Sequence, residues 1–275
     1  MKCIISADPG ELKPYIGEDL LRRLPSNRHL SYQVESGGYL LSFYYLNIKK
    51  PGQRERRVSI YFDRDALLFI TEDEHLRGLM SSCADNEAHI HTIFEFFSQL
   101  TAEDVDSLEH FEERITTLED ELLTGKRSSR ESSRKIIAIR RELLIMKRYY
   151  EQLGLVTAAL SDNEEGFFHA AEQKRFVAIS RRTDRLLESV LHLREYITQV
   201  REAYQAQIDI EQNNIMRIFT VITAIFLPLT LIVGWYGMNF QMPEYAWPFG
   251  YPFVILLSAV ILALTFLLFK IKKWF

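Results

Sequence analysis

The sequence is poor in the residues that mark an enzyme or a disulfide-bonded protein. Its 275 residues include only two cysteines, Cys3 and Cys83. We interpret both as structural or incidental, because two are too few for a disulfide framework. No nucleotide-binding motif is present, which fits a protein without an ATP requirement. The seven histidines are scattered, and no catalytic constellation is visible. We therefore expect no enzyme activity and no cofactor.

Charge is almost absent from two segments near the C-terminal end of the sequence. The segment Ile215–Trp235 carries one charge, on Arg217, and the segment Tyr251–Phe269 carries none. About 20 apolar residues with a rise of 1.5 Å each span a hydrocarbon core of about 30 Å. The connection between the segments is short, so the sequence predicts a hairpin of two membrane helices.

Basic residues are missing from the hairpin loop, whereas Lys270, Lys272 and Lys273 follow the second segment. By the positive-inside rule, both termini lie in the cytoplasm and the loop lies outside, in a multi-pass protein of the inner (plasma) membrane. The first residues contain no long apolar run, so we expect no signal peptide. The part before the membrane is net acidic, which argues against a nucleic-acid partner and is compatible with divalent cations.

The N-terminal region reads as a small α/β domain. Alternating apolar residues and turn residues predict strands, and an apolar pattern at helical spacing begins near Glu74. The predicted strands cover 2–6, 31–34, 39–48, 56–62 and 66–70, and the predicted helices cover 74–82 and 86–100. The segment Asp63-Arg64-Asp65 is a predicted hairpin turn.

Residues 101–160 are predicted to form two long antiparallel helices. A capping box at 101–104 would start the first helix, with Val105 as the first residue of its apolar face. This helix is strongly acidic and the next one is basic. Two interpretations are open: the hairpin has faces of opposite sign, or some of the acids attract a divalent cation toward a conduction path.

Neither proline nor glycine occurs between Phe167 and Pro228. The sequence predicts one helix from about Phe167 to Tyr236, which at roughly 70 residues is about 105 Å long. An apolar seam for a helical partner recurs along it at spacings of three and four, at Leu186, Val190, Leu193, Ile197, Val200 and Tyr204. Such a helix suits mechanical coupling between a soluble domain and a pore, or it is a rigid stalk that holds the domain off the bilayer.

The first membrane segment carries a narrow, mostly uncharged polar stripe. Its members recur every three or four residues and are Asn213, Met216, Thr220, Thr223, Leu227, Thr230 and Gly234. Two spans cannot enclose a pore, so a transporter would need several copies around an axis. The threonines either line such a pore or bond to their own backbone and pack on a neighbour. Neither span nor the loop contains cysteine or histidine, and an oxygen-lined stripe suits hydrated Mg²⁺.

Four motifs together resemble the CorA-type metal-ion transporters. They are the segment from Asn213 to Thr220, the mid-span Phe226-Leu227-Pro228-Leu229-Thr230, the loop Tyr236-Gly237-Met238-Asn239-Phe240 followed by Met242-Pro243-Glu244, and the basic tail from Lys270 to Phe275. The resemblance implies a homopentamer with a cytoplasmic funnel, in which the first span lines the pore and the second packs outside.

The resemblance also implies roles for individual residues. Gly237, Met238 and Asn239 would form the outer selectivity site for hydrated Mg²⁺, and Glu244 is the only acid of the loop. Asn213 would line the inner end of the pore and Met216 would be a hydrophobic constriction. Leu227 and Thr230 would lie deeper in the membrane, and Gly234 would allow close approach under the mouth. The three C-terminal lysines, Lys270, Lys272 and Lys273, would contribute to a basic ring around the neck.

Two positions depart from the family pattern. Gln241 stands where members often carry an acid, and Ala178 stands where some members carry an Asp that binds regulatory Mg²⁺. Mg²⁺ is thus the expected cargo and a possible regulator. The alternatives are a Zn²⁺, Co²⁺ or Ni²⁺ transporter of the same architecture, or a membrane-anchored scaffold or signalling protein with no ion flux.

The predicted fold class is α+β. The predicted parts are an α/β cytoplasmic domain (1–100), a helical hairpin (101–160), a stalk helix (161–214), a first span (215–236), an extracytoplasmic loop (237–250), a second span (251–269) and a basic tail (270–275).

Overall fold

The structure is a computed structural model, and it describes residues 2–7, 32–35, 38–84, 89–124, 129–163, 166–239, 242–243 and 247–272. Contacts divide the chain into two compact units, Met1–Arg201 and Glu202–Phe275, which are described separately below. Three residues with an expected role, Gln241, Glu244 and Lys273, lie outside the described residues.

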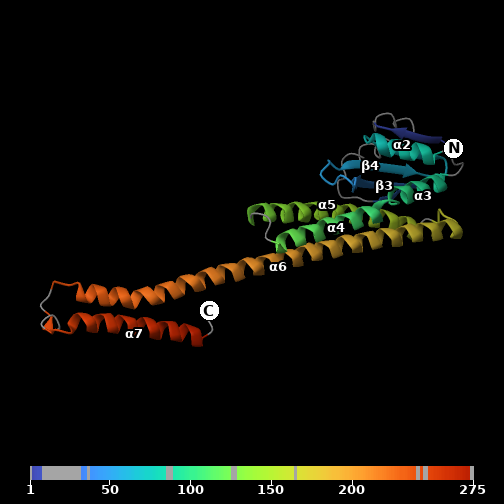
Figure 1. The fold of residues 1–275 in the computed structure, drawn as a ribbon. Coiled ribbons are helices and arrows are strands. Elements are labelled where there is room, and N and C mark those ends of the chain that lie inside the picture. The colour runs from blue at the N-terminus through green and yellow to red at the C-terminus, as the bar shows by residue number, and fades with distance from the viewer. Residues whose placement is uncertain are drawn as a thin grey trace. The chain divides into compact units, whose positions relative to one another are not determined.

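The first unit contains a five-stranded sheet in the order β1-β5-β4-β3-β2 (Figure 1). Its strands are β1 (Lys2–Ser6), β2 (Tyr32–Glu35), β3 (Gly38–Tyr45), β4 (Arg56–Phe62) and β5 (Ala66–Thr71). β1 pairs with β5 in parallel and the other pairs are antiparallel. The turn predicted between β4 and β5 is confirmed, because the Asp63 carboxylate accepts the backbone N–H groups of Asp65 and Ala66 at 2.8 and 2.7 Å.

Two helices, α2 (Glu74–Cys83) and α3 (His89–Leu100), follow the sheet as predicted. Asp73 caps α2, since its side chain accepts the backbone N–H of Leu76 at 3.1 Å. α3 contributes aromatic rings to the core: Phe96 meets Phe69 at 5.1 Å between ring centroids, and Phe97 meets Phe43 at 6.0 Å. These contacts bury one apolar face of the sheet against α3, and a second buried cluster, of Leu40, Leu68 and Ile70, lies on the other face.

The predicted helical hairpin is α4 (Asp104–Leu123) and α5 (Ser129–Asp162). Opposite charges pair across it, at 3.1 Å between Lys135 and Glu121 and at 3.2 Å between Arg114 and Glu142. α5 also joins the sheet, because the Gln152 side chain accepts the backbone N–H of Tyr44 at 3.0 Å. These contacts support the interpretation of a hairpin with faces of opposite sign.

The predicted capping box at the start of α4 is wrong. The Thr101 hydroxyl donates to the Phe97 carbonyl of the preceding helix at 3.1 Å, and Glu103, the N-cap residue, makes no side-chain capping bond. The first buried position of α4 is Asp104, which is 9% exposed, whereas Val105 is 44% exposed. Asp104 keeps the four–three spacing of the buried residues Leu108, Phe111, Ile115, Leu118 and Leu122. The burial of Asp104 is thus set by its place in the helical repeat and not by the hydrophobicity of its side chain.

One helix, α6 (Ala170–Tyr236), runs for 67 residues without interruption, as predicted. It begins three residues later than expected. The Asn163 side chain instead holds the backbone of Phe168 through two hydrogen bonds of 2.9 Å, and the rings of Phe167 and Phe168 contact Tyr39 and Phe62. Packing of this aromatic pair on the sheet therefore sets the start of the helix.

The predicted seam of α6 is packed in the first unit. Its members Leu186, Val190, Leu193, Ile197 and Val200 are at most 3% exposed, and Tyr204 is partly exposed. The partner is α4: the Tyr196 hydroxyl donates to Glu119 at 2.6 Å, and the Arg182 guanidinium donates to the Ala102 carbonyl at 3.0 Å. Figure 1 shows α4 and α5 beside this part of α6.

The second unit contains the remainder of α6 and α7 (Gly250–Ile271), which fit a two-helix hairpin. Both are long and apolar enough to cross a membrane. In this part of α6 only Val221 and Ile232 are buried among the described residues. The less exposed residues of α7 also recur at helical spacing, at Val254, Leu257, Ser258, Ile261, Thr265 and Phe269. Each helix thus turns one face inward and leaves the rest of its apolar surface open.

The seam yields a prediction for stability. Leu193→Ala removes a side chain that is 2% exposed and leaves a cavity between α6 and α4, so it should destabilise the protein by about 2–5 kcal/mol. The matched control is Leu191→Ala on the same helix, where the side chain is 41% exposed and the loss should be below about 1 kcal/mol. Denaturant unfolding of the full chain in detergent, followed by circular dichroism, measures both. Equal losses would contradict the packed seam.

Candidate functional site

The polar stripe lies on the open face of α6. Asn213, Thr220 and Thr223 are exposed, and Met216 and Leu227 are 62% and 68% exposed. At 100° per residue, this stripe lies on nearly the opposite side of the helix from Val221 and Ile232, its buried residues. The hairpin therefore leaves the stripe available for contacts outside its own unit.

The three threonine hydroxyls of the stripe donate to their own helix. Thr220 donates to the carbonyl of Met216, Thr223 to that of Phe219 and Thr230 to that of Phe226, each at 2.8 Å. Of the two alternatives for these threonines, bonding to their own backbone is therefore correct as far as the hydroxyl protons are concerned. Each hydroxyl oxygen keeps lone-pair capacity, so these threonines present acceptors rather than donors to their surroundings. Water molecules around a cation point their hydrogens outward and are matched by such acceptors.

The open face of α6 also carries a shallow groove of about 760 Å³. Four stripe residues and Met238 contribute to it, while Ile222, Phe226, Leu231 and Trp235 form flanks that the three–four spacing did not single out. A Cβ atom added at Gly234 would meet nothing within 4 Å in this chain. Gly234 therefore leaves open surface on α6 that no other described part of this chain covers.

Gly237 ends the helix at the hairpin tip. Its N–H donates to the Val233 carbonyl at 2.9 Å, and the Met238 N–H donates to the Trp235 carbonyl at 3.3 Å. A Cβ atom on Gly237 would lie 2.8 Å from the Val233 oxygen, a distance at which the backbone must shift. Glycine is therefore needed for this close approach, and it places the exposed residues Met238 and Asn239 directly beyond the stripe.

The other end of the hairpin carries the basic residues. Lys270 lies in the last turn of α7, and the N–H of Lys272 donates to the Leu268 carbonyl at 3.1 Å. Because the chain reverses between α6 and α7, these lysines belong to the same end of the hairpin as Asn213 and Met216. The polar stripe therefore runs between a basic end and the Gly237-Met238-Asn239 tip.

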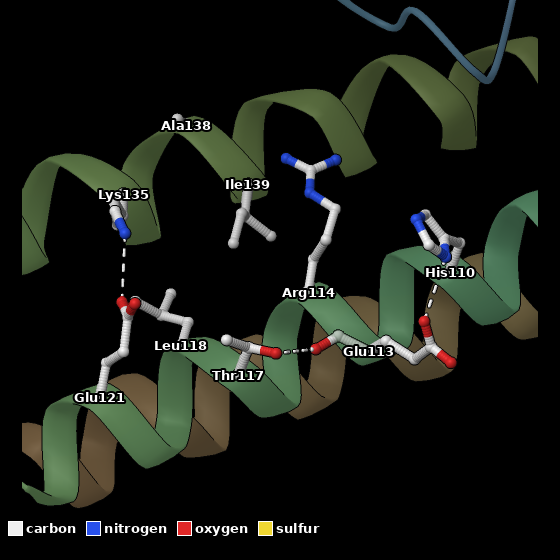
Figure 2. Close-up of a pocket in the computed structure, with 9 residues that line it drawn as sticks. All are labelled: His110, Glu113, Arg114, Thr117, Leu118, Glu121, Lys135, Ala138 and Ile139. Carbon is white, nitrogen blue, oxygen red and sulfur yellow. Dashed lines mark hydrogen bonds and ion pairs between the residues drawn. The ribbon is translucent and has the colours of Figure 1, made fainter.

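A separate groove of about 440 Å³ lies between α4 and α5 in the first unit (Figure 2). Leu118 and Ile139 contribute its apolar surface, and several of its polar groups contact one another: His110 Nδ1 lies 3.0 Å from a carboxylate oxygen of Glu113, and Lys135 pairs with Glu121. Within the described part of the chain, no group of three or more His, Cys, Asp or Glu could hold a metal ion. We place the candidate site on the α6 stripe with Met238 and Asn239, because these residues are exposed along one face of α6 and at its end.

One buried carboxyl was missed by the sequence analysis. The Tyr150 hydroxyl donates to Asp104 at 3.0 Å, inside the junction of α4 and α5. Burial raises the pKa of Asp104 to about 6, against the opposing effects of the Tyr150 hydrogen bond and the Arg182 charge. The sequence signal that could have identified Asp104 as buried is its position four residues before Leu108, in step with the buried face of α4. Ala178, by contrast, is exposed on α6 and offers no oxygen ligand for a regulatory cation.

Comparison with known proteins gives matches along most of the chain. The family model described as CorA-like Mg²⁺ transporter protein matches residues 15–273. The chain is 30% identical over 168 residues to the cobalt/magnesium transport protein CorA of Thermotoga maritima, which covers 61% of this chain and 47% of the relative. It is 43% identical over 93 residues to the magnesium transport protein CorA of Sodalis glossinidius, covering 32% and 29%. The matched parts thus span less than half the length of these relatives.

The fold also matches a solved structure. The CorA magnesium transporter from Methanocaldococcus jannaschii superposes with a TM-score of 0.79 at 21% identity, over 99% of this chain and 90% of that one. At this identity the match supports the fold alone. With the family model matching residues 15–273, the chain belongs to the CorA-like Mg²⁺ transporter family.

Proposed function

We propose that this protein is a membrane transporter that passes hydrated Mg²⁺ through a pore lined by the first membrane-spanning part of α6. The observation that carries the proposal is the exposed stripe of hydroxyl acceptors on α6, opposite its buried face and ending at Gly237-Met238-Asn239. Family membership supports transport as the general activity. The finer roles rest on the chemistry of the stripe.

The stripe suits a cation that keeps its water shell. Mg²⁺ prefers six oxygen ligands and loses its waters reluctantly, so a wall of acceptors can hold the hydrated ion without stripping it. The amide oxygens of Asn213 and Asn239 and the hydroxyls of Thr220, Thr223 and Thr230 would accept hydrogen bonds from those waters. Met216 would form an apolar constriction at the inner end.

Assembly is needed to close the pore. One hairpin offers one stripe, so several copies must surround an axis, and we propose the homopentamer of the family resemblance. The open groove beside Gly234 and the exposed apolar residues of the hairpin would be covered by other copies and by lipid. Gly237, Met238 and Asn239 of each copy would then form a polar collar at the outer mouth, with Glu244 as the nearby acid.

The direction of ion entry follows from the proposed orientation. The loop would lie outside the cell, and Lys270, Lys272 and Lys273 would form a basic ring on the cytoplasmic side. An inside-negative potential favours entry of a divalent ion by about 4.6 kcal/mol per 100 mV. The membrane potential would thus drive uptake without a nucleotide or a resident cofactor.

The collar gives the first test of the function. In reconstituted vesicles, Asn239→Ala should reduce Mg²⁺ influx to the background of empty vesicles, because the collar loses its side-chain acceptors. The matched control is Asn214→Ala, an exposed asparagine of α6 off the polar stripe, which should keep wild-type influx. Unchanged flux in Asn239→Ala would remove that residue from the selectivity site.

The threonines give the second test. Thr230→Val removes a stripe oxygen but keeps the side-chain shape, so Mg²⁺ influx should fall several-fold. Thr265→Val is the control: this hydroxyl also donates to its own helix, to the Ile261 carbonyl at 2.9 Å, but on α7 outside the proposed pore. Equal flux in the two variants would contradict pore lining by the stripe. A scaffold with an inert anchor would show no flux in any variant.

The cargo needs a test of its own, because the matched Thermotoga maritima protein is named a cobalt/magnesium transporter. We expect Mg²⁺ influx into vesicles to persist when Co²⁺, Ni²⁺ or Zn²⁺ is added at lower concentration, since neither span nor the loop contains a cysteine or histidine that would bind those ions strongly. An ion-sensitive dye inside the vesicles reports each ion. Faster entry of one of the competing ions would identify that ion as the cargo instead.

A further inference from the structure

The turn between α3 and α4 joins four parts of the first unit. Lys49, from the loop after β3, pairs with Glu103, and the Arg182 guanidinium of α6 donates to the Ala102 carbonyl at 3.0 Å. The Tyr150 hydroxyl of α5 donates to Asp104 at 3.0 Å. These contacts make residues 102–104 the point at which the sheet region, α5 and α6 meet the start of α4.

Asp104 is the one buried carboxyl at this meeting point among the described residues, and it is 9% exposed. Its neighbour Glu103 is exposed and pairs with Lys49, so solvent and the ion pair satisfy its charge. Asp104 depends on the Tyr150 hydroxyl and on the more distant Arg182 charge. An ionised carboxylate with so few donors is costly to bury, and proton uptake removes that cost.

We propose that Asp104 is a proton-sensitive switch of the first unit: proton uptake on its carboxyl tightens the junction of α4, α5 and α6, and proton loss loosens it. The proposal does not depend on the transported ion. It concerns α6 as well as α4, because Arg182 of α6 binds the same turn.

Among the carboxyl, phenol and amine groups of the junction, the Asp104 carboxyl is the one that changes charge near neutral pH. Burial raises the pKa of Tyr45 to about 12 and also raises those of Tyr149 and Tyr150, so all three stay neutral. The hydrogen bond between Lys49 and Glu103 raises the pKa of Lys49 and lowers that of Glu103. The charged or titratable groups facing the junction are Tyr45, Lys49, Glu103, Tyr149, Tyr150 and Arg182, with His75 acting on Glu103, Asp73 on Tyr45 and Asp106 on Lys49.

The direction of the effect follows from proton linkage. The pKa of Asp104 is raised in the folded junction to about 6, above an ordinary Asp value of about 3.9 when the junction opens. The closed state therefore binds the proton more tightly, and its advantage is lost as pH rises through about 6. Between pH 5 and pH 7 the equilibrium constant for opening should rise by about tenfold.

Hydrogen exchange of the full chain in detergent tests the switch. After correction for the intrinsic pH dependence of exchange, protection of the first turns of α4 should fall about tenfold from pH 5 to pH 7 in the wild type. Asp104→Asn, which stays neutral, should abolish this fall. Asp106→Asn is the matched control: this exposed residue of the same turn should leave the wild-type profile unchanged. A flat wild-type profile, or the same fall in Asp104→Asn, would overturn the proposal.

A second variant tests the proposal independently if Asp104→Asn does not fold. Tyr150→Phe removes the hydroxyl that donates to the ionised carboxylate but keeps the buried ring. The ionised form then loses its donor, so the midpoint of the protection profile should move to higher pH. An unmoved midpoint would overturn the pairing on which the switch rests.

Discussion

The need to satisfy backbone hydrogen bonds in apolar surroundings is the constraint on which the second unit depends. A chain without water to bond must form helices, and α6 and α7 are continuous through their apolar parts. Threonine hydroxyls follow the same constraint by donating to carbonyls one turn back. The hydroxyl oxygens left facing outward on α6 are then acceptors, which is the property that the proposed transport of a hydrated cation requires.

In the first unit, opposite charges and aromatic rings hold the helices instead. Ion pairs join α4 to α5, while a tyrosine and an arginine of α6 bind α4 and the turn before it. Some acids of α4 therefore have a structural partner: Glu119 accepts from Tyr196, and Glu121 pairs with Lys135 in the groove between α4 and α5 (Figure 2). The alternative, in which some acids of α4 attract a cation toward a conduction path, stays a prediction.

Most of the fold could be predicted from the sequence because its elements have strong periodicity. The strands, the hairpin turn at Asp63 and the uninterrupted α6 follow from alternation, turn residues and the lack of proline and glycine. Errors arose where a polar residue occupies a buried position. Asp104 was assigned to a capping box, although its four-residue spacing from Leu108 matches the buried face, and the structure buries it beside Tyr150.

The candidate site could be predicted only in part, for a related reason. The spacing from Asn213 to Gly234 correctly indicated one helical face, and the structure adds that this face is open and opposite Val221 and Ile232. Sequence left open whether the threonine hydroxyls bond to the backbone, and it could not indicate that Gly237 is required by the Val233 carbonyl. Those facts depend on atomic distances. The division into seven parts and the roles of the pore residues stay predictions.

The Arg182 contact has a consequence for how this protein tolerates change. Its acceptor is a backbone carbonyl, which every amino acid supplies. Residue 102 can therefore vary without loss of the contact between α6 and the turn before α4, whereas residue 182 needs a long side chain with a donor at its end. The hydrogen bond is therefore sensitive to mutation at residue 182 but not at residue 102. Substitutions at residue 102 should leave α6 bonded to the turn before α4.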